Sequence, residues 1–126
     1  MKKILIVLAD YYDDISLSLL KSAKNDLNNF SLKVIRVPGV FEIPVTISKN
    51  IKKYDAFLAL GCVIKGETPH FEFISNASTQ AIMNLSVENR KPIGNGIITC
   101  FNIKQAKARG KKGKEAAQAV ISILSQ

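Results

Sequence analysis

The sequence predicts an α/β fold, a three-layer sandwich in which a four-stranded parallel sheet carries helices on both faces. Strand-like runs at residues 4–9, 31–37, 56–64 and 93–100 alternate with segments of helical length and period. The run 56–64 is almost entirely apolar, which is typical of a parallel strand that is buried on both faces. Right-handed crossovers would place the helices on both sides of the sheet, so residues 1–126 are expected to form one domain.

The first strand, residues 4–9, is expected to lead into a helix. Asp14 is a good N-cap residue, and Asn28-Asn29 is a suitable end for the helix. The apolar residues between them recur at helical spacing: Leu17, Leu20, Ala23 and Leu27. This spacing predicts one helix face that is buried against the sheet.

The second strand, residues 31–37, is followed by Pro38-Gly39, a dipeptide that interrupts regular structure. A short helix is then expected over residues 41–51, and Pro44 is acceptable in its first turn. The apolar positions of this helix are four residues apart: Ile43, Ile47 and Ile51. Strand and helix therefore alternate a second time.

The second half of the chain repeats the pattern. Beyond His70 a longer helix is expected, with these apolar residues on one face: Ile74, Ala77, Ala81 and Leu85. After the strand 93–100, Asn102 and Gln105 resemble a capping box and predict the start of another helix. A last helix is expected over residues 114–124, with these residues on its apolar side: Ala117, Val120, Ile121 and Leu124.

Composition and charge restrict the class of protein. The 126 residues are 47% hydrophobic and 22% charged, which is typical of a globular chain. No apolar run approaches the roughly 20 residues of a membrane span, and the N-terminal run ends at Asp10 without a signal-peptide cleavage site. The formal net charge of +8 permits either a nucleic acid or a small phosphorylated ligand as partner.

The two cysteines, Cys62 and Cys100, are far apart in the sequence, and each lies in an apolar run. This placement favours buried, reduced thiols in a cytoplasmic protein. With one histidine and no cysteine cluster, a structural zinc site is not expected.

The loops that follow the first three strands supply a candidate site. Ligands of open parallel sheets bind outside the carboxyl ends of the strands. The three loops contain Tyr11, residues 39–42 and residues 66–70, and we expect them to converge on one crevice. The last loop contains His70, the only histidine of the chain and a proton carrier near neutral pH. The alternative is a surface histidine in an ordinary strand-to-helix loop.

The crevice would combine the ring of Tyr11, the carboxylate of Glu42, glycine-rich backbone and the imidazole of His70. It would contain no nucleophilic cysteine, no serine with a base partner, no metal cage and no dinucleotide-binding loop. Such a set suits proton transfer on a bound heterocycle or carbonyl compound without a cofactor. Two members also have a structural interpretation, Tyr11 as a half-buried loop aromatic and Glu42 as a favourable charge at a helix N-terminus.

A basic segment lies near the C-terminus. It contains six cations and no acid within eleven residues: Lys104, Lys107, Arg109, Lys111, Lys112 and Lys114. Three interpretations remain: a solvated basic face, a stripe that binds RNA or DNA, or a phosphate site in which Arg109 makes paired hydrogen bonds. Phe101 is the only aromatic neighbour, which argues against the nucleic-acid interpretation.

Several motifs together resemble the lumazine synthase family, in the same order and along nearly the whole chain. They lie at residues 37–44 (VPGVFEIP), 60–71 (LGCVIKGETPHF), 94–99 (GNGIIT), 102–106 and 112–113. The resemblance implies a flavodoxin-like fold and a transferase of riboflavin biosynthesis that uses no cofactor. The implied reaction condenses 5-amino-6-(D-ribitylamino)uracil with 3,4-dihydroxy-2-butanone 4-phosphate to 6,7-dimethyl-8-ribityllumazine, phosphate and water.

The resemblance also implies roles for individual residues, with His70 as the catalytic acid–base group. The residues implied to bind the aminouracil and its ribityl chain are Tyr11, Val40, Phe41, Glu42, Val63, Ile64, Lys65 and Asn95. Those implied to bind phosphate are Gly66, Glu67, Thr68 and Arg109. In this family the site lies between subunits of a pentamer, so Asn95 and Arg109 are expected to come from the adjacent chain.

The sequence departs from the family pattern at three places. Lys65 stands where arginine is more common, Phe101 stands where glutamate is more common, and residues 109–113 are several positions shorter than usual. The chain begins almost at its first strand, whereas members that form sixty-subunit shells carry a longer N-terminal arm, so a free pentamer is expected. Two other functions remain as alternatives: a flavin- or lumazine-binding relative without turnover, which His70 argues against, and a basic nucleic-acid-binding module.

Overall fold

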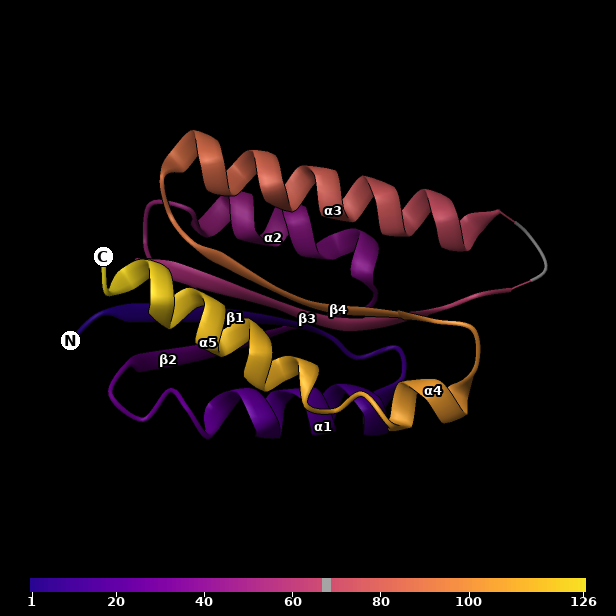
Figure 1. The fold of residues 1–126 in the computed structure, drawn as a ribbon. Helices are drawn as coiled ribbons and strands as arrows, with labels where there is room; N and C mark the ends of the chain where they lie inside the picture. The colour runs from indigo at the N-terminus through magenta and orange to yellow at the C-terminus, as the bar shows by residue number, and fades with distance from the viewer. Residues whose placement is uncertain (67–68) are drawn as a thin grey trace.

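The computed structural model describes residues 1–66 and 69–126, which form an α/β three-layer sandwich (Figure 1). The elements in chain order are β1 (Lys3–Ala9), α1 (Asp13–Lys24), β2 (Ser31–Val37), the 3-10 turn η1 (Val40–Glu42), α2 (Ile43–Asn50), β3 (Ala56–Ile64), α3 (His70–Asn89), β4 (Ile93–Cys100), α4 (Ile103–Lys107) and α5 (Lys112–Leu124). The described strands form one parallel sheet in the order β2-β1-β3-β4, which confirms the predicted fold class.

The helices divide between the two faces of the sheet. Figure 1 shows α2 and α3 on one face and α1 and α5 on the other, with both chain termini at the amino ends of the strands. The carboxyl ends of the strands therefore lie together at the opposite edge. This is the edge at which we expected the loops to converge.

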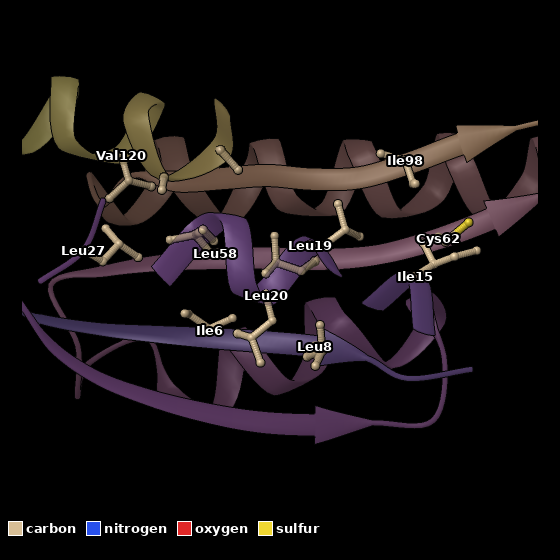
Figure 2. Close-up of a cluster of buried hydrophobic side chains, with 14 of the residues drawn as sticks. Ile6, Leu8, Ile15, Leu19, Leu20, Leu27, Leu58, Cys62, Ile98 and Val120 are labelled. Atoms are coloured by element: carbon tan, nitrogen blue, oxygen red, sulfur yellow. The ribbon is translucent and has the colours of Figure 1, made fainter. Parts of the chain in front are cut away.

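The sheet separates two apolar cores. The core under α1 and α5 includes Leu8, Leu19, Leu58 and Val120, all 1% exposed or less (Figure 2). The core under α2 and α3 is built around Phe57, which is fully buried. Because both faces are covered, eight of the nine residues of β3 are buried, and the strand reads as a continuous apolar run.

The predicted strands agree with the structure, and the predicted helix ends partly do not. The first helix starts at Asp13 and not after an Asp14 cap, because both acids lie in its first turn, where they interact favourably with the helix dipole. It also ends at Lys24, before the expected Asn28-Asn29 end. Leu27 is nevertheless fully buried, since the turn after α1 returns it to the core.

Two predicted helix faces are shifted in the structure. In α1 the expected core residue Leu17 is 41% exposed, because the buried face contains Ile15, Leu19 and Leu20. In α3 the expected Ala77 is exposed, while Ser78 and Ile82 are buried. The serine can occupy a core-facing position because its hydroxyl donates to the carbonyl oxygen of Ile74 at 2.6 Å.

Other predicted elements are confirmed. Asn102 accepts a hydrogen bond from the Gln105 N–H at 2.9 Å, and the Gln105 side chain accepts one from the Phe101 N–H at 2.8 Å. These two bonds form the expected cap of α4. The final helix, α5, buries the predicted Ala117 and Val120, although it begins two residues earlier than predicted.

The structure also bears on classes of site. Cys62 and Cys100 are both buried free thiols, as expected. Within residues 1–66 and 69–126, no group of three or more His, Cys, Asp and Glu side chains is placed to hold a metal ion. In the same part of the chain, no helix has the length and apolar character that crossing a membrane requires.

Candidate functional site

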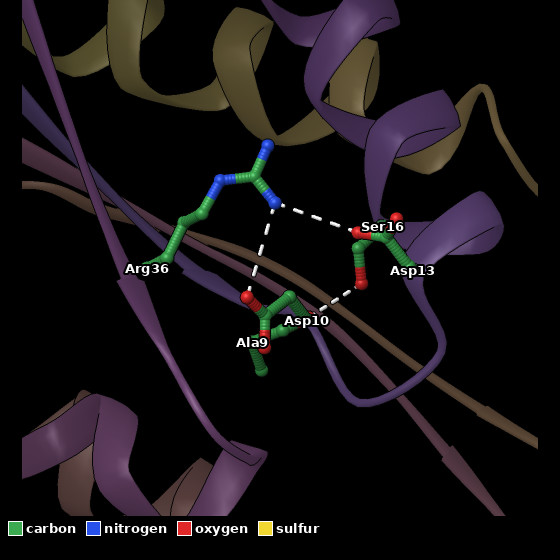
Figure 3. Close-up of polar contacts among 5 residues, drawn as sticks. All are labelled: Ala9, Asp10, Asp13, Ser16 and Arg36. Atoms are coloured by element: carbon green, nitrogen blue, oxygen red, sulfur yellow. Dashed lines mark hydrogen bonds and ion pairs between the residues drawn. The ribbon is translucent and has the colours of Figure 1, made fainter.

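The loop after β1 is held in place by polar contacts with α1 and β2 (Figure 3). The Ser16 hydroxyl, which is fully buried, donates to the carbonyl oxygen of Ala9 at the end of β1. Arg36 of β2 lies 3.8 Å from a carboxylate oxygen of Asp10 and 3.4 Å from one of Asp13. These contacts anchor the backbone just before and just after residues 11–12, and they therefore restrict the directions in which the two side chains project.

Residues 11 and 12 are both tyrosines, and their rings pack edge to face with centroids 4.9 Å apart. Tyr11 is 77% exposed, whereas Tyr12 is partly buried against the core under α1. Burial raises the pKa of the Tyr12 hydroxyl, and the nearby Tyr11 and Cys62 side chains add to the rise. The Tyr12 hydroxyl therefore stays neutral. Its ring packs against the core on one side and against the Tyr11 ring on the other, which restricts the position of Tyr11.

The loop after β2 brings a carboxylate to the same edge. Gly39 is extended, and Val40 begins η1 with its side chain buried. A Cβ atom at Gly39 would lie 3.2 Å from Oε1 of Glu42, so the carboxylate rests against the glycine backbone. Phe41 is 68% exposed beside it.

The loop after β3 leads directly into α3, whose first residue is His70. Gly66 and His70 are described and exposed, whereas the predicted phosphate-binding residues Glu67 and Thr68 lie outside the described residues. The Lys65 N–H donates to the Cys100 carbonyl oxygen at 2.9 Å, and its Nζ lies 5.5 Å from the centre of the Phe101 ring. The two departures from the family pattern, Lys65 and Phe101, therefore contact each other.

These three loops converge on one cavity of about 670 Å³. Its lining contains seven of the predicted site residues: Tyr11, Val40, Phe41, Glu42, Val63, Ile64 and His70. The cavity has the size of a small-molecule site, and one imidazole and one carboxylate lie among mostly apolar walls. The predicted crevice at the carboxyl ends of the first three strands is thus present.

Besides Gly39 of the predicted loop, the cavity lining contains residues that sequence reasoning missed, namely Tyr12, Cys62 and Ile74. Cys62 lies two residues before Ile64 on the same strand, so their side chains project to the same face. Strand alternation could therefore have predicted Cys62 as a lining residue once Ile64 was one. Tyr12 follows Tyr11 directly at a strand end. Which of two adjacent rings is the buried one depends on the loop backbone, so no pattern in the sequence distinguishes them.

Arg109 and Asn95 do not line this cavity. Arg109 lines a second cavity of about 480 Å³ together with Thr99, Lys112 and Glu115. Its guanidinium donates to the Thr99 carbonyl oxygen at 3.3 Å, near the end of β4. Asn95 is exposed on β4, one of the two edge strands of the described sheet, where its side chain accepts a hydrogen bond from the Ile97 N–H at 3.0 Å.

The geometry therefore divides the predicted chemistry between two places on one chain. The first holds rings, a carboxylate and an imidazole, and it can accept a flat polar heterocycle and move protons at its edge. The second is lined by the cations Arg109, Lys111 and Lys112 and by one carboxylate, Glu115, so its excess positive charge can bind an anion. Of these three cations, Arg109 and Lys111 are exposed.

The whole chain, residues 1–126, matches the family model described as 6,7-dimethyl-8-ribityllumazine synthase. The chain belongs to the 6,7-dimethyl-8-ribityllumazine synthase family. The match explains why the motifs of the three loops occur together and in order. It confirms the resemblance that these motifs carried.

Individual members of the 6,7-dimethyl-8-ribityllumazine synthase family are similar over most of their length and nearly all of this chain. A protein of this name from Nitrobacter hamburgensis is 45% identical, with 95% of this chain and 82% of the relative covered. A second from Bartonella tribocorum is also 45% identical, with 97% and 87% covered. A 6,7-dimethyl-8-ribityllumazine synthase 1 from Rhodopseudomonas palustris is 44% identical, with 97% and 83% covered.

Proposed function

We propose that this chain condenses 5-amino-6-(D-ribitylamino)uracil with 3,4-dihydroxy-2-butanone 4-phosphate. The products are 6,7-dimethyl-8-ribityllumazine, phosphate and water, and the reaction is a step of riboflavin biosynthesis. The observation that carries the proposal is the convergence of His70 with six other predicted residues on one cavity, in a chain of this family. The reaction proceeds without a cofactor, and we place the protein in the cytoplasm.

The aminouracil binds in the His70 cavity. Tyr11 stacks on the pyrimidine, while Val63, Ile64 and Lys65 surround the uracil ring. Val40, Phe41 and Glu42 hold the ribityl chain, with Glu42 accepting hydrogen bonds from its hydroxyl groups. The half-buried Glu42 carboxylate beside Gly39 supports this role, because a fixed acceptor loses little freedom when the ligand binds.

His70 moves protons during the condensation. The amino group attacks the ketone, water leaves as the imine forms, phosphate is eliminated, and the second amine closes the ring on the remaining carbonyl with loss of a second water. Each of these steps needs a proton delivered or removed near neutral pH, which imidazole can do in both directions. The position of His70 at the first turn of α3, on the cavity wall, supports this role.

The phosphate group binds to Gly66, Glu67, Thr68 and the guanidinium of Arg109. We propose that Arg109 and Asn95 reach this position from an adjacent copy of the chain in a homopentamer. Two observations support this arrangement. Asn95 lies on the edge strand β4 and the Arg109 guanidinium donates to the Thr99 carbonyl oxygen of that strand, and within one chain neither residue lines the His70 cavity.

The surface over α2 and α3 also supports association with a second copy. A groove of about 230 Å³ between these helices is lined mainly by apolar atoms of Phe41, Val45, Ile74 and Ala81, among others. Val45 is 58% exposed and Phe73 is 67% exposed on the same side. Contiguous apolar surface of this kind is uncommon on a protein that remains a monomer.

The direct test mixes the purified protein with both substrates and follows the fluorescent lumazine. The expected result is product formation above the uncatalysed rate. A rate equal to the uncatalysed one, for protein whose oligomeric assembly has been verified by light scattering, would refute the assignment. A flavin-binding relative without turnover would bind the lumazine tightly in the same assay but form none.

A second test asks whether two chains share each site. His70→Ala and Arg109→Ala chains are each expected to have little activity when the phosphorylated substrate is kept below the KM of the native protein, so they are mixed in equal amounts, unfolded and refolded together, and assayed under that condition. If the two residues come from adjacent chains, about one quarter of the sites in a random ring recovers both native side chains. The expected activity is therefore about one quarter of the native value. No recovery in verified mixed oligomers would place both residues in the same chain's site and contradict the shared arrangement.

A further inference from the structure

The two cysteines lie next to each other on one face of the sheet, which their distance in sequence conceals. The register of β3 and β4 pairs Cys62 with Ile98 and Ile64 with Cys100. Side chains two residues apart on a strand project to the same face, so Cys62 and Cys100 are diagonal neighbours on that face. Both belong to the core under α1 and α5, together with Ile98 and Ile15.

The two thiols differ in their access to solvent. Cys100 is only 1% exposed, whereas Cys62 is 7% exposed and lines the His70 cavity. The two side chains project from adjacent strands into the same core, and Cys100 is among the causes that raise the pKa of Cys62. A ligand entering the cavity would therefore meet Cys62 first and Cys100 directly behind it.

We propose that Cys62 and Cys100 form a two-thiol site for a soft divalent metal ion with linear, two-coordinate geometry, for which Hg(II) is the probe. Binding breaks two S–H bonds and forms two metal–sulfur bonds, and two protons leave to solvent. No electron is transferred. Thiolate sulfur is the ligand type that soft metals select.

The surroundings of the pair favour a divalent ion over other thiophilic ions. Two thiolates and one divalent ion give a neutral complex, whereas a monovalent ion such as Cu(I) leaves one negative charge among isoleucine side chains. An uncompensated buried charge is strongly unfavourable in such surroundings. Zinc prefers four ligands, and among residues 1–66 and 69–126 no third His, Cys, Asp or Glu is placed to complete such a set.

The strand geometry favours a metal bridge over a disulfide. Diagonal neighbours on adjacent strands have Cα atoms about 8 Å apart, given the usual strand spacing and rise per residue. A disulfide requires a Cα separation of roughly 4.4–6.8 Å, so forming one would need the backbone to move. Two metal–sulfur bonds, each about 2.3 Å in the zinc case, span a longer distance.

The test uses the full-length, reduced protein under anaerobic conditions. Hg(II) is supplied as its complex with a monothiol, unbound ion is removed by gel filtration, and mercury per chain is measured by mass spectrometry. Cys62→Ser and Cys100→Ser are the two matched variants, and Ala replacements serve at either position if a Ser variant does not fold. Circular dichroism before and after loading reports whether the chain stays folded.

The expected result is one ion per native chain that resists removal by excess monothiol. Each single variant should hold the ion roughly 10²-fold more weakly, because the second thiolate acts at high effective concentration. Equal retention by either variant would overturn the proposal, as would two independent ions per native chain. Uptake only with loss of the folded circular dichroism signal would overturn it too, because the site would then not belong to the native structure.

Discussion

Replacement of Gly113 by alanine tests the packing that joins the basic segment to the rest of the fold. Gly113 lies in the first turn of α5, where this helix crosses α1. A Cβ atom there would lie 2.0 Å from the carbonyl oxygen of Leu19 and 2.7 Å from the Ser22 hydroxyl. The first of these atoms belongs to the backbone of α1, so it cannot move away by a rotamer change.

The expected effect follows from two opposing contributions. Overpacking of a tight contact costs about 1–3 kcal/mol, and the upper part of this range applies because the obstacle is helix backbone. Alanine is favoured over glycine within a helix by about 1 kcal/mol, which offsets part of the cost. The net destabilisation for Gly113→Ala is therefore about 2 kcal/mol, or roughly a thirtyfold change in the unfolding equilibrium.

Urea unfolding followed by circular dichroism measures this change, with the protein concentration held constant because association shifts apparent stability. A decrease of about 1 M in the urea midpoint is expected, with an unchanged slope. Gly66→Ala is the matched control, since among the described residues a Cβ at Gly66 meets nothing within 4 Å. If the two variants unfolded at the same midpoint, the close approach of α1 and α5 would be wrong.

Four further predictions address the site and its supports. Asn102→Ala removes the side-chain cap of α4 and should cost about 1 kcal/mol of unfolding free energy in the same assay, whereas an unchanged midpoint would show that the cap contributes nothing. Burial raises the pKa of Cys62 to about 12 from 9.0, with Cys100 adding to the rise. Because the thiolate is the reacting form, alkylation of Cys62 should keep accelerating between pH 9 and pH 10.5, and peptide mass mapping that showed a plateau near pH 9 would contradict this pKa. His70→Ala should lower turnover by roughly 10²–10⁴ in the lumazine assay, and an unchanged rate would remove His70 from the mechanism. Arg109→Ala should raise the KM for the phosphorylated substrate, while an equal loss for the aminouracil would contradict its assignment to phosphate.

The candidate site could be predicted from sequence to the extent that it follows the strand ends. Once strands 4–9, 31–37 and 56–64 are assigned to one parallel sheet, their loops must meet at one edge, and the cavity lining confirms that they do. The helix faces were less predictable, because Leu17 and Ala77 satisfy the same spacing rule as the residues that are buried. Helical spacing identifies an apolar stripe along a helix, but the packing of the neighbouring sheet and helices determines which residues of that stripe are buried.

The sequence by itself determined the alternation of strands and helices, the parallel sheet, the His70 loop and the family motifs. These features depend on local periodicity and on residues adjacent in the chain. Tertiary structure alone decided that Tyr12 packs against Tyr11, that Cys62 and Cys100 are neighbours on one face of the sheet, and that Arg109 lies on a different cavity from His70. Those relationships depend on strand order and register, which bring together residues that no spacing rule connects.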